Sequence, residues 1–226
     1  MNEQKKNLLT GCGLLLGFAA VLVFMFLPLI QGKNMIDYFD NLYNTISKGS
    51  AYYIPKLKKD AVRHEGKPVS LVLKIEDDAI RRDLAQVLTV NGLTVESAPG
   101  EISLNADFGK LVGISLEDTD LMFANQGAKI AARYNLPEKN VLFVWWKGLN
   151  AVEKSLTRQK QYSEAKFVGT VVQKGVETAY NYYGISVQNI GDQVYAVVFS
   201  LVFYVVYTLW FGMGIMYLFK GIGLHI

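Results

Sequence analysis

The stretch GLLLGFAAVLVFMFLPLI, residues 13–30, forms the apolar part of a longer run that carries no charged side chain. The uncharged run begins at Asn7, and Lys33 is the first charged residue after it. About 20 apolar residues in a helix cross the hydrocarbon core of a bilayer, so this run is long enough to span it. We therefore predict a first membrane-spanning helix over residues 7–31.

The tetrapeptide LTGC, residues 9–12, is similar to the cleavage site of a bacterial lipoprotein leader. Such a leader needs its apolar segment before the cysteine, because that segment enters the membrane and presents the cleavage site. Here the apolar segment follows Cys12, and only two residues separate Lys6 from the tetrapeptide. The far end of the run, at residues 28–31, has no small–x–small pair for ordinary signal cleavage. We interpret the run as an uncleaved signal anchor that contains Cys12.

A second uncharged run, Gln193 to Phe219, predicts a second membrane-spanning helix over residues 193–219. The two helices bracket a central segment that is long enough for one globular domain. Cys12 is the single cysteine of the chain, so the central segment has no disulfide, thiol nucleophile or cysteine-ligated zinc. Its basic residues are scattered among acidic ones rather than gathered in a stripe, which argues against nucleic acid as a partner.

The charges beside the two runs predict an orientation, because short cytoplasmic segments carry an excess of Lys and Arg. Lys5 and Lys6 lie in the tail of residues 1–6, and Lys220 lies in the tail of residues 220–226. Lys33 and Lys48, beyond the first run, reduce the difference between the two sides. We expect an integral protein of a bacterial inner membrane, with both tails in the cytoplasm and the central domain in the periplasm.

Residues 33–66 are predicted to form a juxtamembrane amphipathic helix and a linker. Apolar side chains recur at the three-four spacing of a helix from Met35 to Ile46, and Gly49 ends the pattern. The segment after Gly49 contains Pro55 and is expected to be irregular. Its aromatic and basic side chains suit contact with lipid headgroups, and a solvated linker is an equally supported interpretation. The residues concerned are Tyr52, Tyr53, Lys56, Lys58 and Lys59.

Residues 67–147 show the pattern of a compact α+β domain. Strands are predicted at residues 69–75, 93–97, 102–108, 110–115 and 141–146, and helices at residues 78–91 and about 118–134. This is the order of the split βαβ, ferredoxin-like fold with one extra hairpin strand. Residues 148–192 are expected to form a further long helix and a linker. The predicted fold class is α+β, a soluble ferredoxin-like domain with an additional C-terminal helix, flanked by two transmembrane helices.

The sequence predicts no catalytic, cofactor-binding or metal-binding residue. The acidic groups at residues 76–78 and 117–120 lie where helices are predicted to begin, so helix capping is preferred to calcium or magnesium binding. Residues 107–109 copy the metal-binding DFG triplet of protein kinases without the other kinase motifs, so a turn between two strands explains them. His64 and His225 suggest neither a catalytic triad nor a metal cage.

Several residues of the two apolar runs are predicted to pack against partner helices. Small residues let helices approach closely in a membrane, and hydroxyl groups far from water need a hydrogen-bond partner. Contact between the two runs of the same chain is the alternative for some of them. The residues are Gly13, Gly17, Ala20, Ser200, Tyr204, Tyr207 and Thr208.

Trp145 and Trp146 form a second candidate contact site. On a strand, consecutive side chains point to opposite faces, so one ring would enter the core and the other would lie on the second face. The second ring is then either covered by the long helix that follows or exposed as an anchor for a partner protein.

These features favour a non-catalytic protein with two membrane spans, an accessory or structural subunit of a multi-subunit membrane complex. Its extracytoplasmic domain would serve protein–protein interaction. Its partners would be other membrane-protein subunits, or a second copy of the chain, together with the lipid bilayer. Two alternatives remain: an extracytoplasmic ligand-sensing domain, and a subunit of a quinone- or lipid-handling membrane enzyme that uses Tyr204, Tyr207 and Trp210.

Overall fold

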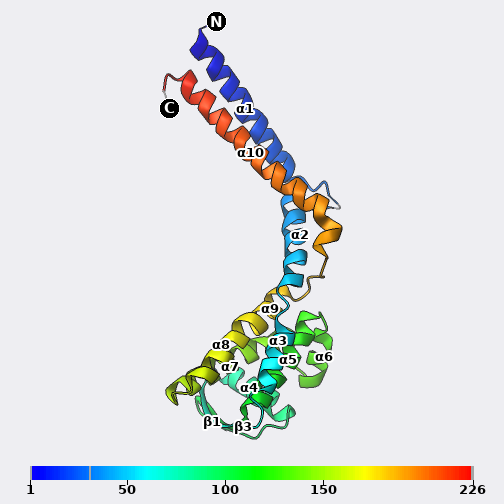
Figure 1. Cartoon of the computed structure of the whole chain (residues 1–226), viewed down its shortest axis with the longest axis vertical. Helices are drawn as coiled ribbons and strands as arrows, with labels where there is room; N and C mark the ends of the chain where they lie inside the picture. Colours follow the sequence, from blue (N-terminus) through cyan, green and yellow to red (C-terminus); the bar gives the residue numbers. More distant parts are fainter. Residues whose placement is uncertain (1, 31, 225–226) are drawn as a thin grey trace. The chain divides into compact units, whose positions relative to one another are not determined.

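The computed structural model describes residues 2–30 and 32–224 and contains two compact units (Figure 1). The first unit combines the two ends of the chain, up to Gly49 and from Val187 onward, and the second comprises Ser50–Ser186. His225 lies outside the described residues. The apolar helices belong to the first unit and the sheet belongs to the second.

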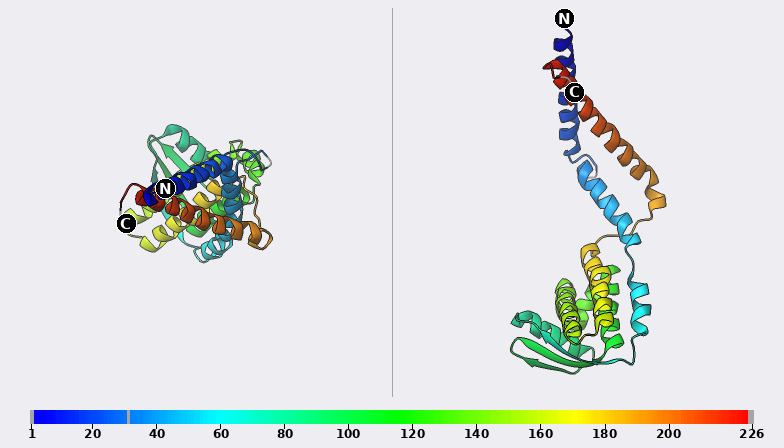
Figure 2. Two further views of the ribbon diagram at one scale, coloured as in Figure 1. Left: turned by 90° about the horizontal axis from the view of Figure 1, so that it is seen from above. Right: turned by 60° about the vertical axis from the view of Figure 1, so that its left-hand side comes forward.

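Two helices of the first unit, α1 (Glu3–Met25) and α10 (Val194–Gly221), could cross a membrane by their length and composition. They run antiparallel and lie side by side (Figures 1 and 2). Helix α1 begins at Glu3 rather than at residue 7, and it ends ahead of Pro28 because a proline disfavours helical backbone in the residue before it. A 3-10 turn, η2 (Ile190–Gln193), leads into α10.

The predicted amphipathic helix is α2 (Met35–Ser50). It contacts the first half of α10, where Phe39 stacks on Phe199 with ring centroids 6.3 Å apart. The Tyr43 hydroxyl and Ser200 Oγ lie 2.5 Å apart. Helix α2 therefore belongs to the same unit as the two apolar helices.

The second unit begins with a helix that the sequence prediction missed, α3 (Ile54–Val62). Pro55 lies in its first turn, where the missing N–H of proline costs no hydrogen bond. Ile54, Leu57 and Ala61 are buried along one face. The linker predicted over these residues is thus partly helical and belongs to the domain.

Three strands form one antiparallel sheet in the order β1-β3-β2, from β1 (Pro68–Lys74), β2 (Val95–Ala98) and β3 (Glu101–Asp107). Leu71 pairs with Leu104 at the centre of β1 and β3. The predicted alternation of β1 is present, because Val69, Leu71 and Leu73 are buried and their neighbours are exposed. Helix α4 (Asp78–Val90) connects β1 to β2.

All regular structure described after β3 is helical, which corrects the predicted fold. The predicted strand at 110–115 lies in α5 (Phe108–Phe123), and the predicted strand at 141–146 lies in α7 (Glu138–Arg158). The predicted helix at 118–134 is the end of α5 followed by α6 (Gly127–Tyr134). A short apolar run suits a buried helix as well as a buried strand, and these two are buried helices. The ferredoxin-like arrangement is not confirmed, and the chain is a mixed, mostly helical α+β protein.

The single helix predicted over 149–183 is also divided. Helix α7 ends at Arg158, and Lys160 adopts a left-handed backbone conformation (φ 63°) at the reversal. The chain continues as α8 (Tyr162–Val171), a π-helix η1 (Val172–Glu177) and α9 (Thr178–Tyr182).

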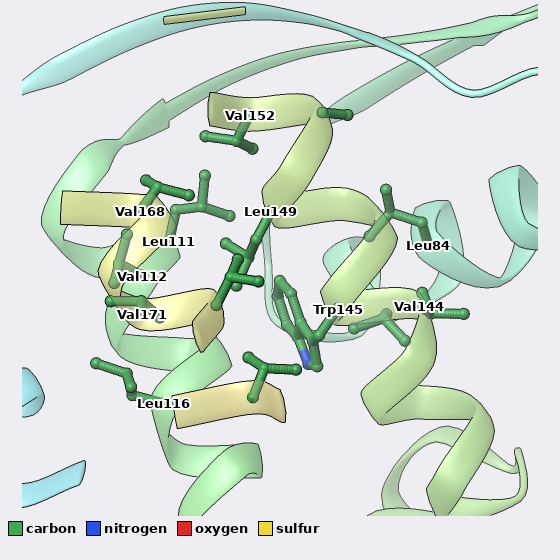
Figure 3. Close-up of a cluster of buried hydrophobic side chains, with 14 of the residues drawn as sticks. Leu84, Leu111, Val112, Leu116, Val144, Trp145, Leu149, Val152, Val168 and Val171 are labelled. Atoms are coloured by element: carbon green, nitrogen blue, oxygen red, sulfur yellow. The ribbon is translucent and has the colours of Figure 1, made fainter. Parts of the chain in front are cut away.

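The core of the second unit lies around helix α7, between it and helices α4, α5 and α8. Trp145 and Leu149 project from α7 into a cluster of aliphatic side chains from α4, α5 and α8 (Figure 3). Both are almost completely buried. Figure 3 labels, besides these two, Leu84, Leu111, Val112, Leu116, Val144, Val152, Val168 and Val171.

Two glycines of α5 should respond oppositely to substitution. A Cβ at Gly109 would lie 2.4 Å from Glu65 N and 2.6 Å from His64 C, both backbone atoms. We expect Gly109→Ala to lower the free energy of unfolding by about 1–3 kcal/mol through overpacking. Gly113 has open space around it, so Gly113→Ala should be neutral or stabilise the helix by about 1 kcal/mol. Thermal unfolding of the full chain in mild detergent measures both, and equal effects would contradict this prediction.

Candidate functional site

The second unit carries an apolar groove of about 360 Å³ between α7 and the segment formed by η1 and α9. Phe143 and Tyr180 line it and are 42% and 43% exposed. Trp146 is half-buried, stacks on Phe143 with ring centroids 5.8 Å apart, and donates its Nε1–H to Glu177 Oε1 at 2.8 Å. Lys147 Nζ lies 5.1 Å from the centroid of the Trp146 ring. The groove therefore presents aromatic surface with a cation at one side.

The far wall of this groove is not a regular α-helix. Val176 and Glu177 belong to η1, where the backbone follows the wider π pattern. Short π segments are rare and occur frequently at functional sites. Trp146 also lines a second hollow of about 1070 Å³, between the end of β1 and α7, whose lining residues are mostly of polar or charged types. Trp146 therefore lines two surface hollows of the domain.

The Trp145 and Trp146 pair has a different geometry from the predicted one. Both belong to helix α7, where consecutive side chains lie about 100° apart rather than on opposite faces. Trp145 is 1% exposed and donates its Nε1–H to Asp118 Oδ2 at 2.8 Å. Its burial is therefore accounted for inside its own domain. Trp146 reaches the groove, and its role as a contact for a partner stays a prediction.

Asp118 is the buried polar centre of the domain. Its Oδ2 accepts hydrogen bonds from the Tyr134 hydroxyl at 2.6 Å and from Trp145, and its Oδ1 accepts one from Arg133 Nη1 at 3.0 Å. Burial raises the pKa of Asp118 above its ordinary value, although the three donors act against that rise. Burial also raises the pKa of Tyr134 to about 12. The predicted capping role for residues 117–120 is wrong, because these residues lie within α5 rather than at its beginning. Asp118 instead ties α5 to α6 and α7.

The other acidic motifs behave as helix caps. Asp77 accepts hydrogen bonds from the backbone N–H groups of Ala79 and Ile80, as predicted. Asp107, in the DFG triplet, accepts one from Lys110 N at 2.9 Å and begins helix α5 rather than a turn between strands. Within residues 2–30 and 32–224, no group of three or more His, Cys, Asp or Glu side chains is placed to hold a metal ion.

The residues predicted to contact lipid headgroups lie in and around α3. The Tyr52 hydroxyl donates to Asp120 Oδ1 at 2.7 Å, and this bond is the main cause that raises the pKa of Tyr52 to about 12. Lys58 Nζ forms an ion pair with Asp120 Oδ2 at 2.6 Å. Lys174 Nζ lies 5.4 Å from the Tyr53 ring centroid. Lys56 and Lys59 are exposed, and headgroup contact stays a prediction.

Several residues predicted to contact partner helices contact other parts of the first unit. Gly17 faces the ring of Trp210, and the Tyr207 hydroxyl donates to the carbonyl of Phe18 at 3.0 Å. Trp210 Nε1 donates to the carbonyl of Leu14 at 3.0 Å. Tyr207 also stacks on Phe18 with ring centroids 4.1 Å apart.

The remaining predicted contact residues differ among themselves. Ser200 meets Tyr43, and the Thr208 hydroxyl donates to the Tyr204 carbonyl in its own helix. Tyr204 itself is 69% exposed. Gly13 and Ala20 are exposed, and no atom would meet a Cβ at Gly13 within 4 Å. Thr208 is exposed as well, so Gly13, Ala20, Tyr204 and Thr208 are the members of the predicted set that a partner helix could still reach.

Three glycines that the sequence prediction missed make the closest contact between α1 and α10. A Cβ at Gly11 would lie 2.5 Å from Leu218 N, and one at Gly221 would lie 2.6 Å from Leu8 Cα. Gly214 lies against a side chain instead, because a Cβ there would lie 2.8 Å from a terminal methyl group of Leu15. The seven-residue spacing of Gly214 and Gly221 places them on one helix face, and that spacing was visible in the sequence.

Compared with known proteins, the chain matches no family model, and neither a curated protein nor a solved structure matches it.

Substitutions at Asp118 should distinguish the contributions of its two carboxyl oxygens to stability. In Asp118→Asn the amide oxygen can keep the bonds from Tyr134 and Trp145, whereas the amide NH2 group replaces Oδ1 and faces the N–H donors of the partly exposed Arg133. We expect a loss of about 1–3 kcal/mol in the free energy of unfolding, because one bond is lost and a buried donor has no acceptor. Asp118→Ala leaves the buried Trp145 N–H unpaired and should cost about 3–5 kcal/mol. Exposed Glu117→Gln is the control, with a change within about 0.5 kcal/mol.

The same carboxyl group should make stability depend on pH. Because the pKa of Asp118 is raised in the folded chain above about 3.9, the folded state binds its proton more tightly than the unfolded state does. The contribution of Asp118 to the free energy of unfolding is therefore greatest at low pH and falls as the pH rises from about 4 through the folded pKa. Asp118→Asn should remove this slope in denaturant unfolding measured across that range. An unchanged slope would contradict the assignment.

Proposed function

We propose that this chain is a non-catalytic membrane protein with two spans that acts as an accessory or structural subunit of a multi-subunit membrane complex. The single observation that carries the proposal is the aromatic groove of the second unit, where Phe143, Trp146 and Tyr180 lie around an apolar hollow. Exposed aromatic residues that gather in a hollow are typical of protein-binding surfaces, where tryptophan and tyrosine dominate the affinity. The groove is the surface that we assign to the partner protein.

The orientation in this proposal follows the positive charges beside the apolar helices. Lys5, Lys6 and Lys220 favour cytoplasmic ends, which would place the α+β domain in the periplasm of a bacterial inner membrane. The exposed Gly13, Ala20, Tyr204 and Thr208 are the residues that we assign to contact with a partner helix, either of another subunit or of a second copy.

Site-directed photo-cross-linking in the native host tests the assigned groove. We expect a photoreactive residue at position 143 or 180 to give one adduct of defined mass, because both side chains line the hollow. Tyr162, which is 63% exposed and lies outside the groove, is the matched control position. The double substitution Phe143→Ala and Tyr180→Ala should lower co-purification of the adducted protein by about tenfold or more. Equal adducts from positions 143, 180 and 162 would count against the proposal.

Cysteine labelling tests the orientation independently. In a Cys12→Ser background, Lys160→Cys places one thiol in the exposed reversal between α7 and α8. A maleimide that cannot cross membranes should label this thiol in intact spheroplasts. Glu3→Cys in the same background is the control at the start of α1, on the proposed cytoplasmic side of the membrane, and should react only after lysis. Labelling of Glu3→Cys alone in intact spheroplasts would reverse the orientation.

A further inference from the structure

The first unit contains a groove of its own, separate from the surface assigned above to a partner protein. A hollow of about 500 Å³ lies between the end of α1, helix α2 and the first half of α10. Its volume falls in the range of about 300–1,000 Å³ that is usual for small-molecule sites. Phe203 and Tyr207 line it from α10, and Asp40 and Tyr43 line it from α2.

The groove follows from the way in which the two apolar helices pack. Glycines bring α1 and α10 into backbone contact at Gly11 and Gly221, whereas rings fill the space between them at Phe18 and Tyr207. The helices therefore diverge toward the beginning of α10, as the right-hand view of Figure 2 shows. Helix α2 lies beside the diverging part and forms the other wall of the groove.

The groove is more polar near Ser200 than near Phe203 and Tyr207. Ser200 and Tyr207 are seven residues apart on α10, which corresponds to about 10 Å along the helix. That length lies within a helix that could cross the hydrocarbon core, whose thickness is about 30 Å. Asp40 and Tyr43, one turn apart on α2, supply charge and polarity near Ser200. A ligand with a polar head and a hydrocarbon chain matches this arrangement.

The hydrogen bonds at the polar end define what the head must supply. Ser200 Oγ donates to the Val197 carbonyl at 2.8 Å, so in its contact with Tyr43 it must accept the tyrosine proton. Tyr207 donates its proton to the Phe18 carbonyl. Three of the four hydroxyl groups that line the groove have thus already donated their protons, the fourth being that of exposed Tyr204.

The groups that remain at this end accept hydrogen bonds. The Tyr43 oxygen keeps a lone pair. The Asp40 carboxylate can only accept hydrogen bonds, and it accepts one from Asn44 Nδ2 at 3.1 Å. A head that carries N–H donors and positive charge complements these acceptors. A quinone ring offers carbonyl acceptors instead, and an anionic head would be repelled by Asp40.

We propose that this groove binds a membrane lipid with a primary ammonium head, a phosphatidylethanolamine. Its ammonium group donates to the Asp40 carboxylate and to the Tyr43 oxygen, and one acyl chain lies along Phe203 and Tyr207. A choline head carries the same charge but has no N–H donor, so it fits less well. This inference does not depend on the partner protein proposed above.

Native mass spectrometry of the full chain in mild detergent tests the proposal. The probes are phosphatidylethanolamine, its N-methyl and N,N-dimethyl derivatives and phosphatidylcholine, all with the same acyl chains. Each methyl group removes one N–H donor without changing the charge. We expect affinity to fall along this series, by about tenfold between its ends, which is the usual effect of one charge-assisted hydrogen bond.

Matched variants connect that preference with the groove. Asp40→Asn should lower the affinity for phosphatidylethanolamine to that for phosphatidylcholine, because the anionic acceptor is lost. Asp37→Asn, an exposed position on the same helix outside the groove, should leave the series unchanged. Leu201→Trp places a larger side chain in the groove and should weaken all four lipids. Circular dichroism melting curves confirm that each variant folds.

Three results would overturn the proposal. Equal binding of phosphatidylethanolamine and phosphatidylcholine would show that the N–H donors are not recognised. An equal effect of Asp40→Asn and Asp37→Asn would show that the preference arises outside the groove. Tighter binding of an isoprenoid quinone than of phosphatidylethanolamine, lost in Leu201→Trp, would assign the groove to the quinone.

Discussion

The backbone contact between α1 and α10 at Gly11 and Gly221 is the constraint on which the first unit depends. Between lipid-exposed helices the hydrophobic effect supplies little attraction, because acyl chains are as apolar as leucine. Close packing has to replace it, and only glycine permits the approach seen at Leu218 and Leu8. The aromatic side chains further along cannot pack as closely, so the helix pair widens there, and the groove beside α2 is a consequence of that widening.

Asp118 has the corresponding role in the second unit. Burying a carboxyl group is costly unless donors surround it, and here they come from Arg133, Tyr134 and Trp145 on α6 and α7. A network of this kind specifies one arrangement of three helices, because other arrangements would leave the Trp145 N–H or the carboxylate unpaired. It also explains why Trp145 is internal, whereas Trp146, the next residue on the same helix, reaches the surface groove.

The sequence predicted the elements whose signals are local. Strand β1 alternates strictly, Asp77 caps α4, and both apolar helices follow from uncharged runs. The prediction failed at α5 and α7. There the short apolar runs at 110–115 and 141–146 were assigned to strands, although each run is part of a helix that continues beyond it. The three-four spacing of Trp145, Leu149, Val152 and Leu156 continues one helix beyond the second run. Which face of α1 meets α10, and that Asp118 is internal, depend on contacts distant in sequence, which no local pattern contains.

Most hydroxyl and indole groups of the apolar helices donate their protons to backbone carbonyls. Ser200 and Thr208 donate within α10, and Tyr207 and Trp210 donate to α1. Where water is excluded, such a bond satisfies the donor. These side chains therefore stabilise the helices and have no proton left to donate to a ligand. What they leave to their surroundings is oxygen lone pairs. A ligand that contacts these four side chains therefore supplies the hydrogen-bond donors, so the bonds that hold the helices together also limit the chemistry of what binds beside them.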